Sequence, residues 1–293
     1  MISETGSGDS IDEFKAIFIG VVQGHHWAWE VAGVLHRDIS MENIMFYRSG
    51  SEVVGMLNDW DHAEEQCNLR QIKFDIVPAR REVQKIDGVS NEQNTPNNAE
   101  IDCDPPQSKG KCSDNSTQTS ESQLGTVKAR YRAGTIPFMA IELLQAKSVY
   151  PFHRYRFDIE SFCYVLVWFC LGFDPQKHTV AHIERWDHED LMRNAWAKLR
   201  FLEDHRERKI LWNRARSKKY LNLCKTWAVP ISHMLCDVQE RDRAIKHLII
   251  EDYVSSPEQL SDKIGGWKRE VASYEQAREQ VITYEKVMNV LLR

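Results

Sequence analysis

Residues 34–43 read V-L-H-R-D-I-S-M-E-N. Asp38 stands five residues before Asn43, and a second acidic pair, Asp59 and Asp61, follows a short distance later. A carboxylate and an amide at this spacing, with another carboxylate close downstream, are able to hold a nucleophilic hydroxyl group and the magnesium ion of ATP in one place. The segment therefore predicts an ATP-dependent site.

The composition of the 293-residue chain, with 42% hydrophobic and 28% charged residues, suffices for one large core or two modest ones. Its net charge of -5 gives no general attraction to nucleic acid or to an anionic membrane, so we expect neither partner. Residues 1–10 lack the features of a signal peptide, and the longest apolar run, residues 162–173, is too short to span a bilayer. We therefore expect a cytoplasmic or nuclear protein. Its seven scattered cysteines, without a C-x-x-C pair, predict neither disulfides nor zinc.

The segments around the central loop show clear periodicity. Apolar residues at helical spacing predict a first helix over residues 11–32, which the following glycine ends. The β-prone segments 44–47 and 53–57 are joined by R-S-G-S-E, which predicts a hairpin. Such a hairpin would carry Asp59 back towards Asp38.

The remaining chain alternates between polar and apolar segments. Residues 66–128 are rich in Ser, Asn, Gln, Asp and Thr, which predicts a disordered insertion, and residues 1–9 are expected to be a disordered terminus. The apolar residues 162–173 predict a core helix that Asp158 caps. Residues 256–293 predict a C-terminal amphipathic helix, which more often docks on its own domain than on another chain. Further helices are expected over residues 187–202, 206–213 and 230–250.

Three motifs follow the H-R-D loop in a fixed order: N-D-W-D at residues 58–61, G-T through A-I-E at residues 134–142, and D-I-E-S beginning at Asp158. The set resembles protein kinases. In particular it is similar to the fungal-type protein kinase family, whose catalytic loop has the H-R-D-I-S form. The resemblance covers roughly residues 11–173. It implies a mainly α (α+β) fold, with a kinase-like C-terminal lobe over residues 10–255 that includes a small β-hairpin.

The resemblance implies catalytic and cofactor-binding roles for five residues. Asp38 would accept or orient the proton of a substrate hydroxyl, while Asn43 and Asp59 would bind the Mg²⁺ of ATP. Ser40 replaces the lysine that many serine/threonine kinases carry two residues after the catalytic aspartate. Thr135 stands where these enzymes place a threonine against that aspartate, which favours a Ser/Thr acceptor over tyrosine.

Four more residues are expected to have structural or regulatory roles. His36 would be a packed residue, Asp158 would anchor the catalytic-loop backbone, and Glu142 would keep the ion pair of the A-P-E segment. Arg37 would pair with a phosphorylated activation segment. The candidate phosphate acceptors there are Thr126 and Tyr131.

Two departures from kinases leave the function open. Asp61 replaces the glycine of D-F-G, and only 35 residues, without a glycine-rich loop or strand lysine, precede His36. We therefore expect a C-terminal lobe whose N-terminal β-lobe is missing, through a truncated gene model or because a partner completes it, and very weak binding of Mg-ATP. Three alternatives remain: a Ser/Thr protein kinase that is weak or inactive as an isolated chain, a pseudokinase that binds protein partners, and a small-molecule phosphotransferase, which the A-x-E segment with Thr135 disfavours.

Overall fold

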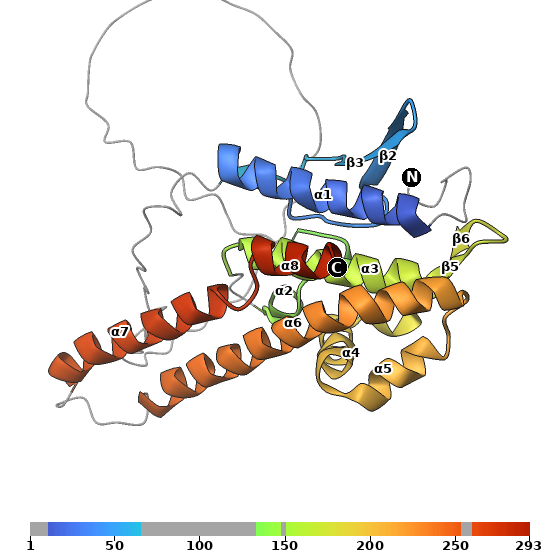
Figure 1. Cartoon of the computed structure of the whole chain (residues 1–293). Coiled ribbons are helices and arrows are strands. Elements are labelled where there is room, and N and C mark those ends of the chain that lie inside the picture. Colours follow the sequence, from blue (N-terminus) through green and yellow to red (C-terminus); the bar gives the residue numbers. More distant parts are fainter. Residues whose placement is uncertain (1–10, 66–132, 148–150, 253–259) are drawn as a thin grey trace, which may run out of the picture. The chain divides into compact units, whose positions relative to one another are not determined.

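The computed structural model describes residues 11–65, 133–147, 151–252 and 260–293, and the side chains of residues 248–252 and 260–268 are not among those described. The predicted disordered segments 1–9 and 66–128 lie outside these ranges. In chain order the elements are α1 (Ile11–Ala32), β1 (Val34–Leu35), β2 (Ile44–Ser49), β3 (Glu52–Leu57), β4 (Glu64–Glu65), the 3₁₀ helix η2 (Ile136–Phe138), α2 (Ile141–Gln145), α3 (Tyr155–Gly172), β5 (Phe173–Asp174), β6 (Thr179–Val180), the 3₁₀ helix η3 (Glu184–Trp186), α4 (Leu191–Glu203), α5 (His205–Trp212), α6 (Lys218–Asp252), α7 (Leu260–Glu279) and α8 (Tyr284–Leu291). Long helices and short antiparallel strand pairs agree with the predicted mainly α (α+β) class (Figure 1). None of the described helices is long and apolar enough to cross a membrane.

Helix α3 forms the centre of the hydrophobic core, since every residue after Tyr155 in it is buried. A helix without an exposed face needs neighbours on all sides, and α6 packs along it. On another side the ring of Phe14 from α1 stacks on that of Phe169, with 4.3 Å between ring centroids. The core therefore joins elements that are far apart in the sequence.

The prediction that Asp158 caps α3 is wrong. The N-cap residue is Arg154, which makes no side-chain capping bond, and Asp158 lies inside the first turn. Its carboxylate faces the interior and accepts hydrogen bonds from groups outside the helix. An acidic residue at a helix start usually suggests a cap, but Asp158 instead makes long-range hydrogen bonds.

Helix α1 has the predicted bounds, and Gly33 follows it with a φ of 66°, as expected of a helix-ending glycine. Strand β3 of the β2–β3 hairpin packs against α1 (Figure 1). The hairpin register pairs Ile44 with Leu57, which places the two ends of the hairpin side by side. At the closest approach a Cβ on Gly55 would lie 2.1 Å from the carbonyl oxygen of Ile17, so only glycine allows this packing.

The helices after α3 differ from the predictions in their bounds. Helix α4 begins at Leu191 because the side chain of Asp190 caps it, accepting from the amide of Met192 at 2.9 Å. Helix α6 begins at Lys218, well before the predicted residue 230, and continues through Pro230. The buried residues of its first half explain this continuity, because packing against α3 offsets the hydrogen bond that proline removes. They are Tyr220, Leu223, Cys224, Trp227 and Ala228.

The C-terminal region contains two helices, where the sequence predicted a continuous one. Helix α7 ends at Glu279, and the hydroxyl of Thr283 caps α8 by accepting from the amide of Lys286. The Thr283 cap starts a second helix. The short break between α7 and α8 interrupts the apolar spacing only briefly, so the sequence pattern resembles that of one helix. Both helices contact α6.

Candidate active site

The loop between β1 and β2 brings Asp38 against Thr135, which is 97 residues away in the sequence. Oδ1 of Asp38 accepts from the hydroxyl of Thr135 at 2.7 Å and from its amide at 2.8 Å. Gly134 makes the approach possible, since its φ is 115° and a Cβ there would lie 3.0 Å from the carbonyl oxygen of Arg37. The structure thus places Thr135 where the resemblance to kinases implies it.

Asn43 and Ser40 contact the same loop in different ways. The side-chain nitrogen of Asn43 donates to the carbonyl oxygen of Asp38 at 2.9 Å and lies 3.4 Å from its Oδ2. This contact turns the amide oxygen of Asn43 away from Asp38. The Ser40 hydroxyl is buried and accepts from the amide of Asn43 at 3.3 Å, so it shapes the turn. In the structure Ser40 therefore contacts its own loop and does not stand in for a lysine.

The hairpin returns the N-D-W-D segment to this loop, as predicted. The amide of Asn58 donates to the carbonyl oxygen of Asn43 at 2.9 Å. His36 is buried, and its Nε2 donates to the carbonyl oxygen of Asn58 at 2.9 Å. Desolvation lowers the pKa of His36, which favours the neutral ring whose Nδ1 accepts from the amide of Asp38 at 3.3 Å. His36 therefore acts as a packed connector between the loop and the hairpin.

Asp59 directly follows Asn58 and is exposed, with a φ of 59°. A positive φ is uncommon at non-glycine residues, and aspartate adopts it more readily than most other residues. Asp61, two residues later, is also exposed. The turn thus presents the exposed carboxylate of Asp59 close to the start of β2, which Asn43 directly precedes.

The amide oxygen of Asn43 and the carboxylate of Asp59 are hard oxygen donors, the type that Mg²⁺ prefers. Among the described residues no group of three or more His, Cys, Asp or Glu side chains is arranged to hold a metal ion. Magnesium often binds proteins through only one or two side chains and takes its other ligands from phosphates and water. The donor set therefore fits a magnesium ion that arrives with a phosphorylated ligand.

The carboxylate of Asp158 anchors the backbone of the loop that carries Asp38. Its Oδ2 accepts from the backbone amide of His36 at 2.9 Å, and its Oδ1 lies 3.2 Å from the amide of Arg37. The ring nitrogens of His25 and His153 each lie 2.8 Å from this carboxylate. Burial alone would raise the pKa of Asp158, but the contacts with His153 and His25 outweigh it and hold the pKa well below its usual range. The carboxylate is therefore charged and ties α1, the loop and α3 together.

The sequence prediction missed both histidines. His25 continues the buried face of α1, where Val21 and Val22 precede it at helical spacing, so its burial was readable from the pattern. His153 lies before α3 in an irregular segment and carries no such signal.

Arg37 forms an ion pair with Glu64, whose Oε2 lies 2.8 Å from its guanidinium nitrogen. The pairing of β1 with β4 sets Glu64 opposite Leu35 and explains why the two charges meet. The phosphate acceptors proposed for Arg37, Thr126 and Tyr131, lie outside the described residues. Within the described part of the chain, Arg37 therefore pairs with Glu64 of the same chain.

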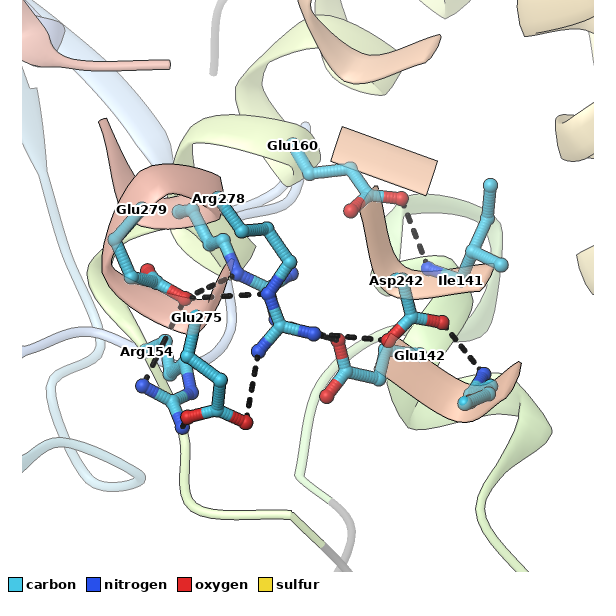
Figure 2. A network of polar contacts seen from close by, with 10 residues as sticks. Ile141, Glu142, Arg154, Glu160, Asp242, Glu275, Arg278 and Glu279 are labelled. Carbon is cyan, nitrogen blue, oxygen red and sulfur yellow. Dashed lines mark hydrogen bonds and ion pairs between the residues drawn. The ribbon is translucent and has the colours of Figure 1, made fainter. Parts of the chain in front are cut away.

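Glu142 forms the ion pair expected at this motif, and its partners are Arg156 and Arg278. Nitrogen atoms of Arg156 and Arg278 lie 2.5 Å and 3.8 Å from its Oε2. Figure 2 shows Arg278, from α7, in contact with Asp242 of α6 and with Glu279 as well. Burial would raise the pKa of Glu142, but the charge of Arg156, with that of Arg278, holds it below its usual value. The C-terminal helices therefore secure the end of this motif.

Comparison with known proteins gives one family. The family described as fungal protein kinase matches residues 7–76 and 97–170, which contain α1, the loop of Asp38, the hairpin, Thr135 and most of α3. Searches of curated proteins and of solved structures gave no match. The order of motifs, the contacts between them and the family match agree, and over this part of its length the chain belongs to the fungal protein kinase family.

Proposed function

We propose that the chain carries the catalytic loop of a protein serine/threonine kinase, which transfers a phosphoryl group from Mg-ATP to a protein hydroxyl group. The observation that carries this proposal is the asymmetric environment of Asp38. Oδ1 of Asp38 accepts two short hydrogen bonds from Thr135, whereas the one contact of Oδ2 with another described residue is that with Asn43 at 3.4 Å. Oδ2 is thus the oxygen available to accept the hydrogen bond of a substrate hydroxyl and orient it for attack.

Asn43 and Asp59 are the residues that would hold the metal. A bound magnesium ion supplies charge that offsets the negative charge on the transferring phosphoryl group. Asn43 donates its amide hydrogens to Asp38, so the residue that orients the acceptor and the residue that holds the metal are fixed relative to one another. This coupling is what positioning catalysis requires.

Two features lead us to expect weak nucleotide binding by the isolated chain. Ser40, in place of a lysine, is buried in its own turn. Arg37 already pairs with Glu64. In the described loop the phosphate charge would therefore be met mainly by the metal, and we expect a dissociation constant for Mg-ATP of about 1 mM or weaker.

Such weak binding is measurable by NMR with methyl-labelled methionine. Met45 lies in β2, two residues after Asn43, and Met234 lies in α6 as a distant reference. Titration with Mg-ATP should shift the Met45 signal and leave Met234 unchanged, and Asp59→Asn should weaken the effect. The exposed Asp12→Asn is the matched control, because it removes the same charge from the first turn of α1. Equal shifts in wild type and Asp59→Asn would contradict the proposed metal site.

A second candidate function is that of a pseudokinase that binds a protein partner. The same occupied Arg37 and inward-facing Ser40 favour it, because they leave the loop without a cation for the phosphates. If Mg-ATP leaves the Met45 signal in place throughout the titration, the kinase proposal is rejected in favour of this alternative.

A further inference from the structure

Two buried ionisable side chains, Lys198 of α4 and Glu160 of α3, lie outside the site described above. Each has 0% solvent exposure. Charged groups are costly to bury, and well-packed apolar residues of similar size often stabilise a protein as much or more. One oxygen of Glu160, Oε2, is buried without a hydrogen-bond partner among the described residues. Packing alone therefore does not account for this pair.

Lys198 binds the backbone of the segment that follows Thr135. Its Nζ donates to the carbonyl oxygen of Met139 at 2.6 Å and to that of Ile136 at 3.1 Å. It also lies 4.5 Å from the ring centroid of Tyr164, a cation–π distance. Burial lowers the pKa of Lys198 to about 7, against the opposing effect of Glu160. The amine therefore contacts η2 and the turn after it.

Glu160 binds the other end of the same segment. Its Oε1 accepts from the amide of Ile141 at 2.9 Å, as Figure 2 shows, and from the hydroxyl of Tyr164 at 2.7 Å. Burial raises the pKa of Glu160. Lys198 and Glu160 thus hold carbonyl groups and an amide group of residues 136–141 from two different helices.

This segment connects the two motif residues that meet the rest of the site. Thr135, just before it, holds Asp38, and Glu142, just after it, is held by Arg156. We propose that Lys198 and Glu160 are positioning residues, which keep residues 136–141 in the conformation that presents Thr135 to Asp38 and supports a protein acceptor. The support of a protein acceptor rests on the proposed kinase function, whereas the positioning of residues 136–141 does not.

The decisive variant is Lys198→Met, because methionine keeps most of the side-chain volume and removes both hydrogen bonds. Hydrogen–deuterium exchange of the amides of Phe138, Met139 and Ile141 should become at least about ten-fold faster. Exchange in α1 should stay unchanged. Lys209→Met is the matched control, because this exposed lysine of α5 undergoes the same chemical change.

Two further measurements separate positioning from packing. Lys198→Arg restores donors for the carbonyl groups and should recover part of the lost protection. In the folded wild type, acetic anhydride should label Lys198 much more slowly than Lys209, although an accessible amine with a low pKa would react faster. Unchanged exchange in Lys198→Met, or a rise spread equally over α1, would overturn the proposal. Labelling of Lys198 as fast as Lys209 would overturn it even if the variants failed to fold.

The acceptor side is tested with casein as the phosphate acceptor. Lys198→Met should raise the KM for casein at least about ten-fold and change the KM for Mg-ATP less than about two-fold, because the segment supports the acceptor and not the metal. A rise in both constants would contradict the acceptor role. If wild type transfers no phosphate to casein, the kinase proposal fails for this acceptor, while the exchange data still decide the positioning role.

Discussion

Replacing Asp158 by asparagine tests how the loop that carries Asp38 is held. The residue is 1% exposed, and its carboxylate accepts from the backbone amides of His36 and Arg37 and from the rings of His25 and His153. Asparagine has nearly the same shape, so the change alters charge and hydrogen bonding and leaves no cavity. The variant therefore isolates the electrostatic contribution of the anchor.

The expected magnitude follows from these contacts. The amide nitrogen of asparagine would replace one carboxylate oxygen, so the donors that face this oxygen lose their acceptor and meet another donor. A buried donor left unsatisfied costs about 1–3 kcal/mol, and breaking a buried charged pair costs about 3–5 kcal/mol. We expect Asp158→Asn to lower the free energy of unfolding by about 3–5 kcal/mol.

Urea unfolding followed by circular dichroism measures this difference. Asp190→Asn is the matched control, since asparagine caps a helix as well as aspartate does and the exposed site should change by only a few tenths of a kcal/mol, roughly. The pKa of Asp158 in the folded state lies below the ordinary value of 3.8. The charged carboxylate therefore contributes to the free energy of unfolding above pH 3.8, and this contribution is lost as the pH falls from 3.8 towards the folded-state pKa. The gap between wild type and variant should accordingly shrink at pH 3. A gap below about 1 kcal/mol at pH 7 would refute the anchor role.

Two other substitutions test the packing that supports the site. Gly55→Ala should destabilise the chain by about 1–3 kcal/mol in thermal or urea unfolding, because the Cβ would collide with the backbone of α1, whereas Gly24→Ala, where a Cβ meets nothing within 4 Å, should stabilise by up to about 1 kcal/mol. If both alanine variants unfold alike, the close approach of α1 and β3 is wrong. Arg278→Met should cost about 3 kcal/mol, because Arg278 is 3% exposed and its loss leaves the buried carboxylate of Asp242 and the partly buried carboxylate of Glu142 without that cation. The partly exposed Arg243→Met should change stability by less than about 1 kcal/mol, and an equal effect of the two arginine changes would count against the network.

The local parts of the fold could be predicted from the sequence because local rules determine them. The apolar spacing and Gly33 gave the bounds of α1, and the R-S-G-S-E connection gave the hairpin. The resemblance to kinases also implied that Thr135 lies against Asp38, a contact that the structure contains. In each case a short pattern has few alternative conformations.

Long-range polar contacts could not be predicted in the same way. An acidic residue near a helix start has the same appearance whether it caps the helix or, like Asp158, accepts bonds from α1 and the loop. Lys198 lies on an amphipathic helix, where a lysine usually faces solvent, but in the structure it is buried against η2 and the ring of Tyr164. The sequence predicted a helix from residue 230, yet α6 begins at Lys218 and continues through Pro230 because it packs against α3. These outcomes depend on neighbours that a single segment does not specify.

The proposed kinase function requires that Asp38 orient an acceptor hydroxyl group for phosphoryl transfer. The direct measurement is the transfer of label from γ-labelled ATP with magnesium to casein, followed by analysis of the phosphorylated amino acids. We predict slow labelling of serine and threonine by the wild-type chain, a loss of at least about a hundred-fold in Asp38→Asn, and no loss in the exposed control Asp12→Asn. Equal labelling by wild type and Asp38→Asn, or labelling confined to tyrosine, would contradict this account.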